Sequence, residues 1–291
     1  MYAITGITGH VGGATADQLL AAVEPVRAVV RDPAKGREWA ERGAEVAVAD
    51  LADTAALTAA FTGCDGVFVL LPTIPTGTDA DHRAMADSIA AAVAASGVPH
   101  VVALSSLGAD LAAGNGPIRW LHHLEQRLGG TGARLTAIRA PHFQEKVEEV
   151  LGAVTGAGLY PVFADSADIP VPMVATRDVG AAAADALLSP PAASEVVDLA
   201  APEYTERQVA ETLGELLGTT PAVAPIPRPG WLDALTGAGL PPQLAAEIVA
   251  LNDAANSGIL QPRGDRRRHC STPLADTLRA VLRTHPTRDA A

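Results

Sequence analysis

The feature that most constrains this chain is a glycine-rich turn close to its N-terminus. Gly6, Gly9 and Gly12 directly follow a short apolar run and precede a helical pattern. A tight turn, and a pyrophosphate that comes close to the backbone, both require residues without a Cβ. The helix that follows offers free N–H groups and the positive end of its dipole to an anion. The segment therefore predicts a dinucleotide site, with an ordinary glycine-rich turn as the alternative, and its expected contacts are Gly6, Thr8, Gly9, His10, Val11 and Gly12.

Short apolar runs alternate with helical patterns through the first half of the chain. The expected strands lie at residues 2–5, 26–30, 45–49, 66–71 and 100–104, and the expected helices at 11–23, 34–42, 54–61 and 79–96. Most of the apolar runs are continuous, which is typical of parallel strands that are covered on both faces. The alternation predicts an α/β fold with a Rossmann-type, doubly wound parallel sheet. Further strands are expected at 134–139 and 196–199, with helices at 117–128, from residue 176 onward, and at 205–217.

The tip of the second expected strand carries positive charge. A site specific for NAD usually places an acidic side chain there to hold the ribose hydroxyls. Here Arg31 stands at the tip and Lys35 lies one turn further on, and both can bind a 2′-phosphate. Asp32 leaves NAD open, and a solvated surface pair is the alternative for the two cations. We therefore expect NADP(H), with Asp50 and Leu51 at the adenine after the third strand.

The composition of the sequence changes after Gly218. Residues 221–229 are rich in proline and cannot form a central strand. Helical patterns follow at 231–235, 241–256 and 272–282, and residues 257–268 are expected to form a loop that ends in a solvated cluster of three arginines. We expect an NADP-binding Rossmann core at 1–143, with 159–200 returning to it. A smaller, mostly helical lobe on the substrate side is expected at 144–158 and 201–291.

Charge and composition disfavour several classes of function. The formal net charge of −12 argues against binding to nucleic acid. No apolar run is long enough to span a membrane, and the start of the chain lacks the pattern of a signal peptide, so a cytoplasmic location is expected. Cys64 and Cys270 are the only cysteines, too few for a disulfide framework and not spaced as metal ligands, so no metal is expected. The expected partner is a small-molecule substrate, and a homodimer is left open.

Several segments together resemble the NmrA-like family of atypical short-chain dehydrogenases. The resemblance includes the glycine turn, residues 30–35, and residues 67–72, where Leu71 is expected to reach the cofactor. It continues through 104–109, 132–143 and 176–180, and so extends over nearly the whole chain. The family includes NADPH-dependent quinone and small-carbonyl reductases, isoflavone-type reductases, and regulators that bind the cofactor without obvious turnover. The resemblance implies NADP(H) as the cofactor.

The usual acid catalyst of short-chain dehydrogenases is missing from this sequence. Those enzymes use Tyr-x-x-x-Lys, but Tyr2, Tyr160 and Tyr204 are followed four residues later by glycine, alanine and glutamine. Many NmrA-like proteins keep a lone lysine on the helix before the sixth strand, and Leu121 stands at that place here. A proton donor must therefore be sought elsewhere.

Three side chains are candidates for that donor. His122 borders the apolar stripe of the helix at 117–128 and can donate a proton near neutral pH, with a half-buried histidine of no chemical role as the alternative. Ser105 follows the fifth strand, where its hydroxyl either binds a carbonyl oxygen or the nicotinamide amide, or simply caps the strand. The resemblance places His142 in the segment that usually walls the substrate pocket, which makes it the third candidate.

The resemblance also implies which side chains form the substrate pocket. Phe143 is expected as an apolar wall beside His142, and Lys146 replaces the asparagine that is usual in the family. Trp120 is a further candidate, although burial in the core is the commoner explanation for a tryptophan.

Three functions are compatible with these features. The first is NADPH-dependent reduction of a small conjugated or aromatic carbonyl or a quinone, because a quinone is electrophilic enough to accept a hydride with little acid catalysis. The second is a redox sensor that binds NADP(H) without turnover. The third is a biosynthetic enzyme, such as a cyclase or isomerase, whose reaction is not a net redox change. Turnover of NADPH with quinones separates the first from the second.

Overall fold

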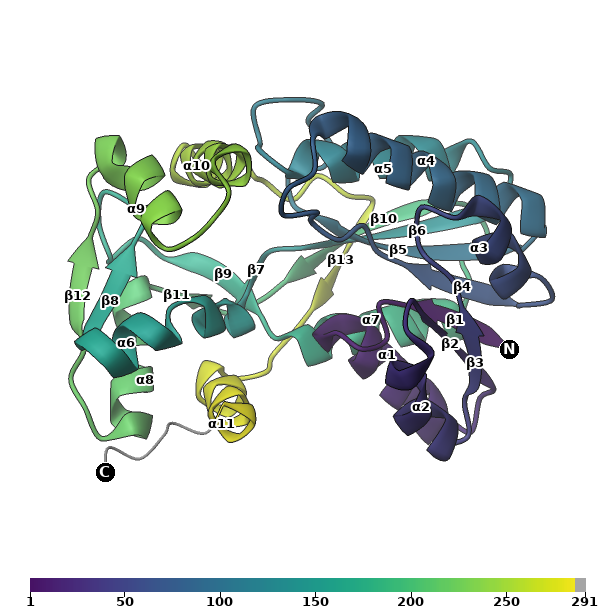
Figure 1. The fold of residues 1–291 in the computed structure, drawn as a ribbon, viewed down its shortest axis with the longest axis horizontal. Coiled ribbons are helices and arrows are strands. Elements are labelled where there is room, and N and C mark those ends of the chain that lie inside the picture. The colour runs from purple at the N-terminus through teal and green to yellow at the C-terminus, as the bar shows by residue number, and fades with distance from the viewer. Residues whose placement is uncertain (286–291) are drawn as a thin grey trace.

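The computed structural model describes residues 1–285 and has an eight-stranded sheet at its centre (Figure 1). The strands lie in the order β13-β10-β6-β5-β4-β1-β2-β3, and every pair of neighbours runs parallel. Their bounds are β1 Tyr2–Thr5, β2 Val26–Val30, β3 Glu45–Val48, β4 Gly66–Val69, β5 His100–Ser106, β6 Arg134–Ala140, β10 Glu195–Ala200 and β13 Arg266–His269. Because the order reverses between β1 and β4, the sheet is doubly wound, and the expected Rossmann-type fold is confirmed.

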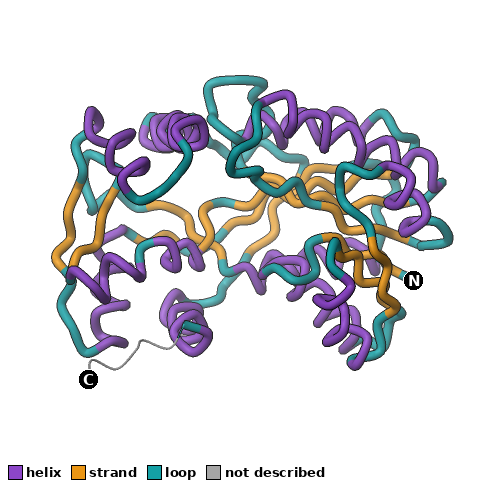
Figure 2. Tube along the Cα trace, in the orientation of Figure 1, coloured by secondary structure: helices purple, strands orange, loops and turns teal. Residues whose placement is uncertain are grey.

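Helices cover both faces of this sheet, so that the sheet forms the middle of three layers (Figure 2). One face packs against α1 (His10–Ala21), α2 (Arg37–Glu41) and α7 (Thr176–Leu188). The other face packs against α3 (Thr54–Phe61), α4 (Asp79–Ser96) and α5 (Ile118–Gly129). Each face has its own buried apolar cluster, which explains why the strands are continuously apolar.

The remaining elements form a smaller, mostly helical part at the other end of the molecule (Figure 1). It has two small sheets, β7-β9-β11 and β8-β12, and an apolar core of its own beneath α6, α8 and α11. The bounds are β7 His142–Phe143, η2 Gln144–Glu149, α6 Leu151–Ala157, β8 Leu159–Val162, β9 Val171–Val174, β11 Glu203–Tyr204, α8 Glu206–Leu217, β12 Ala222–Pro225, η3 Arg228–Gly230, α9 Trp231–Gly237, α10 Pro242–Asn256 and α11 Leu274–Thr284. A short 3₁₀ turn, η1 (Pro33–Gly36), belongs to the core.

The expectation of a loop through the three arginines at 266–268 is wrong. These residues form β13, the edge strand of the large sheet, paired with β10. Arg266 binds Glu195 at 2.7 Å and Arg268 binds Asp185 at 2.5 Å. An edge strand exposes its outer side to solvent, so it accommodates charges that a central strand would exclude.

The division into core and lobe is more interleaved than the sequence indicated. Residues 171–174 and 159–162, expected within the core, lie in the small sheets and pack into the apolar cluster of the smaller part. Conversely, β13 falls within 201–291 but joins the large sheet. The chain therefore crosses between the two parts several times. A cleft between them is lined by residues of both parts.

The longest described helix is α4, with 18 residues, and its sequence includes Asp79, Asp81, Arg83 and Asp87. None of the helices within residues 1–285 is both long and apolar enough to cross a membrane.

Val23 is expected to weaken the fold, because it ends α1 in a left-handed conformation. Its φ is +61°, the residue is 89% exposed, and its N–H donates to the carbonyl of Leu20 at 3.0 Å. This position of a helix end favours glycine, whereas a β-branched side chain is strained there. Val23→Gly should raise the free energy of unfolding by about 1 kcal/mol, measured by chemical denaturation. The control Ala22→Gly, at φ −81°, should lower it, and destabilisation by Val23→Gly would contradict the assignment of strain.

Candidate active site

The glycine turn between β1 and α1 is held by close backbone contacts. Gly6 has a φ of +59°, and the N–H of Gly9 donates to its carbonyl at 2.9 Å. A Cβ on Gly12 would overlap this same carbonyl group, so only glycine lets α1 approach the turn so closely. A Cβ on Gly6 would meet the Leu70 side chain at 2.5 Å. Two of the three glycines are thus required by the packing of the protein itself.

Gly9 has a different reason to be glycine. Its φ is −102°, and the nearest atom to a Cβ placed there is the Gly6 carbonyl oxygen at an ordinary 3.4 Å. Protein atoms therefore leave room for a side chain at this position. The absence of one leaves the outer surface of the turn open to a closely approaching ligand.

The start of α1 provides the donors for an anion. The N–H groups of His10, Val11 and Gly12 have no acceptor within residues 1–285, Gly9 supplies no side-chain cap, and the first turn contains no acid. Free N–H groups and the helix dipole both favour a negatively charged ligand here. The turn and the helix end together fit the pyrophosphate of a dinucleotide.

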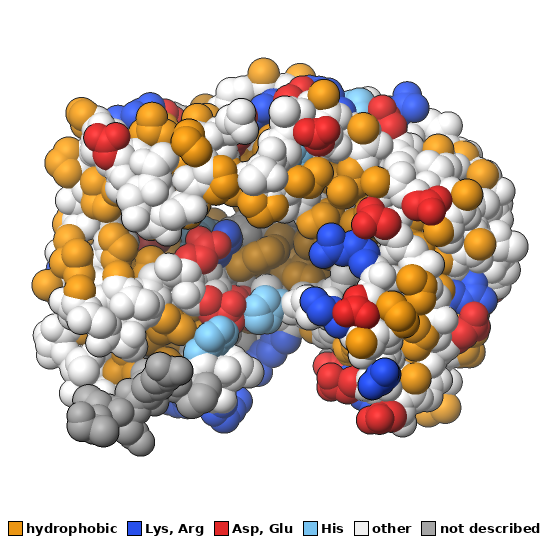
Figure 3. Space-filling model, in the orientation of Figure 1, with side chains coloured by type: hydrophobic (Ala, Val, Ile, Leu, Met, Phe, Trp, Pro, Cys, Tyr) orange, Lys and Arg blue, Asp and Glu red, His pale blue; other side chains and the backbone are white. Residues whose placement is uncertain are grey.

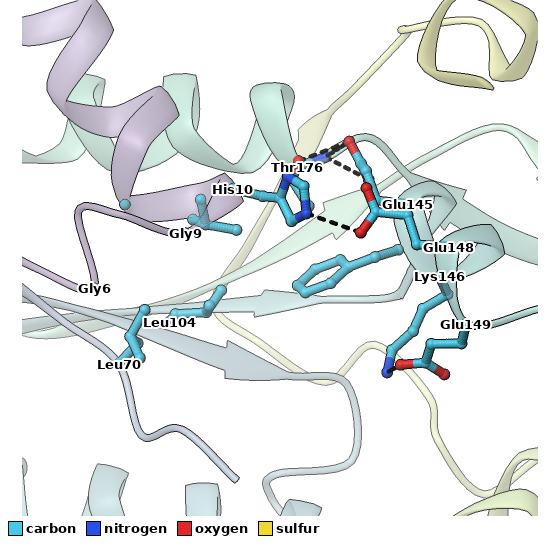
Figure 4. Close-up of a pocket in the computed structure, with 13 residues that line it drawn as sticks. Gly6, Gly9, His10, Leu70, Leu104, Glu145, Lys146, Glu148, Glu149 and Thr176 are labelled. Carbon is cyan, nitrogen blue, oxygen red and sulfur yellow. Dashed lines mark hydrogen bonds and ion pairs between the residues drawn. The ribbon is translucent and has the colours of Figure 1, made fainter. Parts of the chain in front are cut away.

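A cavity of about 290 Å³ opens directly from the glycine turn. Figure 3 shows the molecule hollowed between its two parts, with hydrophobic side chains deep in the hollow and charged side chains around it. The core contributes the turn and the ends of β4 and β5, and the smaller part contributes β7 and η2 (Figure 4). The lining residues are Gly6, Gly9, His10, Val11, Gly12, Leu70, Leu104, Phe143, Glu145, Lys146, Glu148, Glu149 and Thr176.

Glu145 holds the far wall of this cavity against the core. Its carboxylate accepts hydrogen bonds from the Thr176 N–H at 2.9 and 3.1 Å and from the Thr176 hydroxyl at 2.6 Å. The N-cap of α7 is Ala175, which has no side-chain acceptor, so Glu145 caps α7 from a distant part of the chain. Beside it, Lys146 binds Glu149 at 2.5 Å. The hydrogen bonds between Glu145 and Thr176 fix η2 opposite the glycine turn.

The tip of β2 is positively charged. Arg31 and Lys35 are exposed, and neither forms an ion pair with any carboxylate in the part of the chain that the structure describes. The carboxylate of Asp32 accepts the N–H of Ala34 at 2.9 Å and so caps η1. Asp50 similarly accepts the N–H of Ala52 at 2.9 Å.

Ser105 lies at the end of β5 but is buried beneath α5. Its hydroxyl donates to Glu125 at 2.5 Å, and Arg139 binds the same carboxylate at 2.6 and 3.0 Å. Residues of a strand alternate between faces, and Leu104 faces the cavity, so Ser105 projects to the opposite face. Its only hydroxyl proton is donated to Glu125, which leaves lone pairs free to accept a hydrogen bond.

The two candidate histidines lie in different surroundings. Nδ1 of His122 donates to the Ala109 carbonyl at 2.8 Å, so Nε2 is its free ring nitrogen. His142 is exposed to solvent. His142 precedes Phe143, which lines the cavity, and neither histidine is itself among the lining residues. Their chemical roles remain predictions.

Of the other residues predicted for the substrate pocket, two line the cavity and one is buried away from it. Phe143 and Lys146 line the cavity. Trp120 is buried, stacks on His82 with ring centroids 3.5 Å apart, and donates to Asp79 at 2.9 Å, so it joins α4 to α5.

Leu70 lines the cavity, whereas the predicted Leu71 packs with Leu51 against the core beneath α3 and α4. Sequence reasoning missed Leu70, Leu104 and the three glutamates of η2. A dense run of charge at 145–149 was the one available signal for the glutamates.

Comparison with known proteins agrees with this geometry. The model of an NAD(P)H-binding family matches residues 6–190. An NAD(P)H azoreductase of Xenophilus azovorans is 29% identical over 249 residues, 84% of each chain. Quinone oxidoreductase 2 of Escherichia coli is 29% identical over 265 residues, 89% of each chain.

Solved structures show the same fold along almost the whole chain. The Escherichia coli quinone oxidoreductase in complex with NADPH superposes with a TM-score of 0.76 at 24% identity, covering 97% of this chain and all of the other. A Citrobacter sp. triphenylmethane reductase in complex with NADP(H) gives 0.78 at 23% identity with the same coverage. The chain belongs to the NAD(P)H-binding family, and its fold is of the NmrA-like type that the sequence resembles.

Gly9→Val tests the site without disturbing the fold. Because a Cβ at Gly9 has room in the protein, the variant should fold normally, but its side chain should obstruct the surface that a pyrophosphate approaches. NADPH should bind at least about tenfold more weakly, measured by calorimetry. An unchanged dissociation constant in a folded variant would show that the dinucleotide binds elsewhere.

Proposed function

We propose that this protein is an NADPH-dependent oxidoreductase that reduces a small quinone or a conjugated aromatic carbonyl, without a Tyr-x-x-x-Lys dyad. The observation that carries the proposal is the cavity beside the glycine turn. Its floor is apolar, formed by Leu70, Leu104 and Phe143 at the ends of the strands. In parallel α/β sheets this is the edge at which ligands bind. The relatives named as an azoreductase and a quinone oxidoreductase support conjugated acceptors of the same kind.

Each part of the site has a distinct task in such a reaction. The N–H groups of His10, Val11 and Gly12 hold the pyrophosphate, and Arg31 with Lys35 holds the 2′-phosphate that distinguishes NADPH from NADH. The apolar floor excludes water from the reacting atoms. When bound, NADPH supplies the hydride.

Proton delivery differs from that of typical short-chain dehydrogenases. The hydroxyl hydrogen of Ser105 is donated to Glu125 on the face of the sheet opposite the cavity, so Ser105 does not act as the proton donor. A quinone accepts a hydride readily because its product anion is stabilised by the aromatic ring, and that anion takes its proton from solvent. His122 and His142 remain the donor candidates for a less electrophilic ketone.

Arg31→Ala tests the preference for NADPH. The 2′-phosphate is present only in NADPH. Arg31 forms no ion pair with a carboxylate in the described chain, so its charge is available to this phosphate. The substitution should weaken NADPH binding by about tenfold or more while NADH binding changes little. Equal losses for both cofactors would remove Arg31 from the phosphate site, and a preference of the unmodified protein for NADH would contradict the assignment outright.

Single-turnover oxidation of NADPH by a quinone tests the chemistry. Ser105→Ala, His122→Ala and His142→Ala should each alter the hydride-transfer rate by less than about tenfold between pH 5 and 9, because no protein acid is required. With a simple ketone, loss of the true donor should cost about 10²-fold or more. A collapse of quinone turnover in one histidine variant would contradict the proposed mechanism. Tight NADPH binding without turnover of any acceptor would identify a sensor instead.

A further inference from the structure

One polar contact connects the glycine turn to the smaller part across the cavity. Nε2 of His10, the first residue of α1, lies 3.2 Å from Oε2 of Glu148 on η2, although the two residues are 138 positions apart. Figure 4 shows the two side chains pointing toward one another from opposite walls. The His10 side chain is 56% exposed and that of Glu148 is 23% exposed. The other carboxylate oxygen of Glu148 is buried and has no hydrogen-bond partner in residues 1–285.

A carboxylate in this place conflicts with the function of the turn. The start of α1 is built to receive an anion, and Glu148 places a second negative charge on the opposite side of His10. Two anions that share a partly buried site repel one another unless a cation lies between them. Within residues 1–285, His10 is the one side chain that forms a hydrogen bond or ion pair with Glu148, and it can become that cation.

The other charges around the cavity do not remove the conflict. On η2, Lys146 is paired with Glu149, and Glu145 accepts three hydrogen bonds from Thr176. On α7, Arg177 and Asp178 both contact Thr272, outside the cavity lining. The first turn of α1 contributes no acid, and His10 is its only titratable side chain. The wall therefore carries three carboxylates and one ammonium group facing the anion site.

We propose that His10 and Glu148 form a proton-coupled clamp on the cofactor: His10 takes up a proton from solvent when the dinucleotide binds, and as an imidazolium it donates one N–H to Glu148 and offers the other to the pyrophosphate. Neutral imidazole has a single N–H and can satisfy only one of the two anions, whereas imidazolium satisfies both. Glu148 is a positioning residue, because it orients the ring and stabilises its positive charge.

The proposal rests on dinucleotide binding and not on the reaction proposed above. A neutral imidazole must gain a proton from solvent before it can donate to both anions. Binding of NADPH at pH 7.5 should therefore take up as much as about one proton, and affinity should fall by up to about tenfold for each pH unit above that.

Calorimetry of NADPH binding in buffers of different ionisation enthalpy measures this proton directly. At pH 7.5 the phosphate monoester of the cofactor, which titrates at about pH 6, contributes little. The unmodified protein should take up a proton, His10→Gln should abolish the uptake and flatten the pH dependence of affinity, and Glu148→Gln should reduce both.

Glu149→Gln is the matched control, since this carboxylate lines the same wall but is paired with Lys146 instead of His10. Its proton uptake should equal that of the unmodified protein. Binding without proton uptake in the unmodified protein, or undiminished uptake in His10→Gln, would overturn the clamp even if the protein proves to be an active quinone reductase. Conversely, full proton uptake without turnover would support the clamp and overturn the proposed reaction.

Discussion

The close approach of α1 to the turn before it is the contact on which the site depends. A Cβ on Gly12 would overlap the carbonyl group of Gly6, and a Cβ on Gly180 of α7 would meet that of Ala14 in α1 at 2.5 Å. α1 is therefore held between the turn and a neighbouring helix by contacts that only glycine permits. This packing fixes the direction of its free N–H groups, and with it the place where an anion binds.

The second wall of the site depends on one carboxylate. Glu145 caps α7 although it lies 31 residues before Thr176, and this contact attaches η2 to the core at the mouth of the cavity. Charge-assisted hydrogen bonds are among the stronger polar contacts in proteins. The smaller part thus shapes one wall of the cavity, while the glycine turn and the start of α1 in the core form the other.

Local signals in the sequence predicted the parts of the fold that depend on local rules. The glycine spacing marked the turn, and continuous apolar runs marked the buried parallel strands. The helix expected at 205–217 is α8, which begins with a capping box formed by Thr205 and Gln208. β13 was missed because three consecutive arginines resemble a solvated loop, and only the pairing with β10 makes them a strand. The partners of Ser105 and His10 were also beyond prediction. Glu125 and Glu148 are 20 and 138 residues away, so their positions follow from the tertiary fold alone.

The central claim is that the dinucleotide binds in the cleft between the glycine turn and η2, in contact with both parts of the molecule. Hydrogen–deuterium exchange with and without NADPH tests it most directly, because free N–H groups that gain an acceptor exchange more slowly. The account predicts slower exchange at residues 9–13 and also at 144–149. Protection confined to other segments, or protection of the turn with none at 144–149, would contradict it.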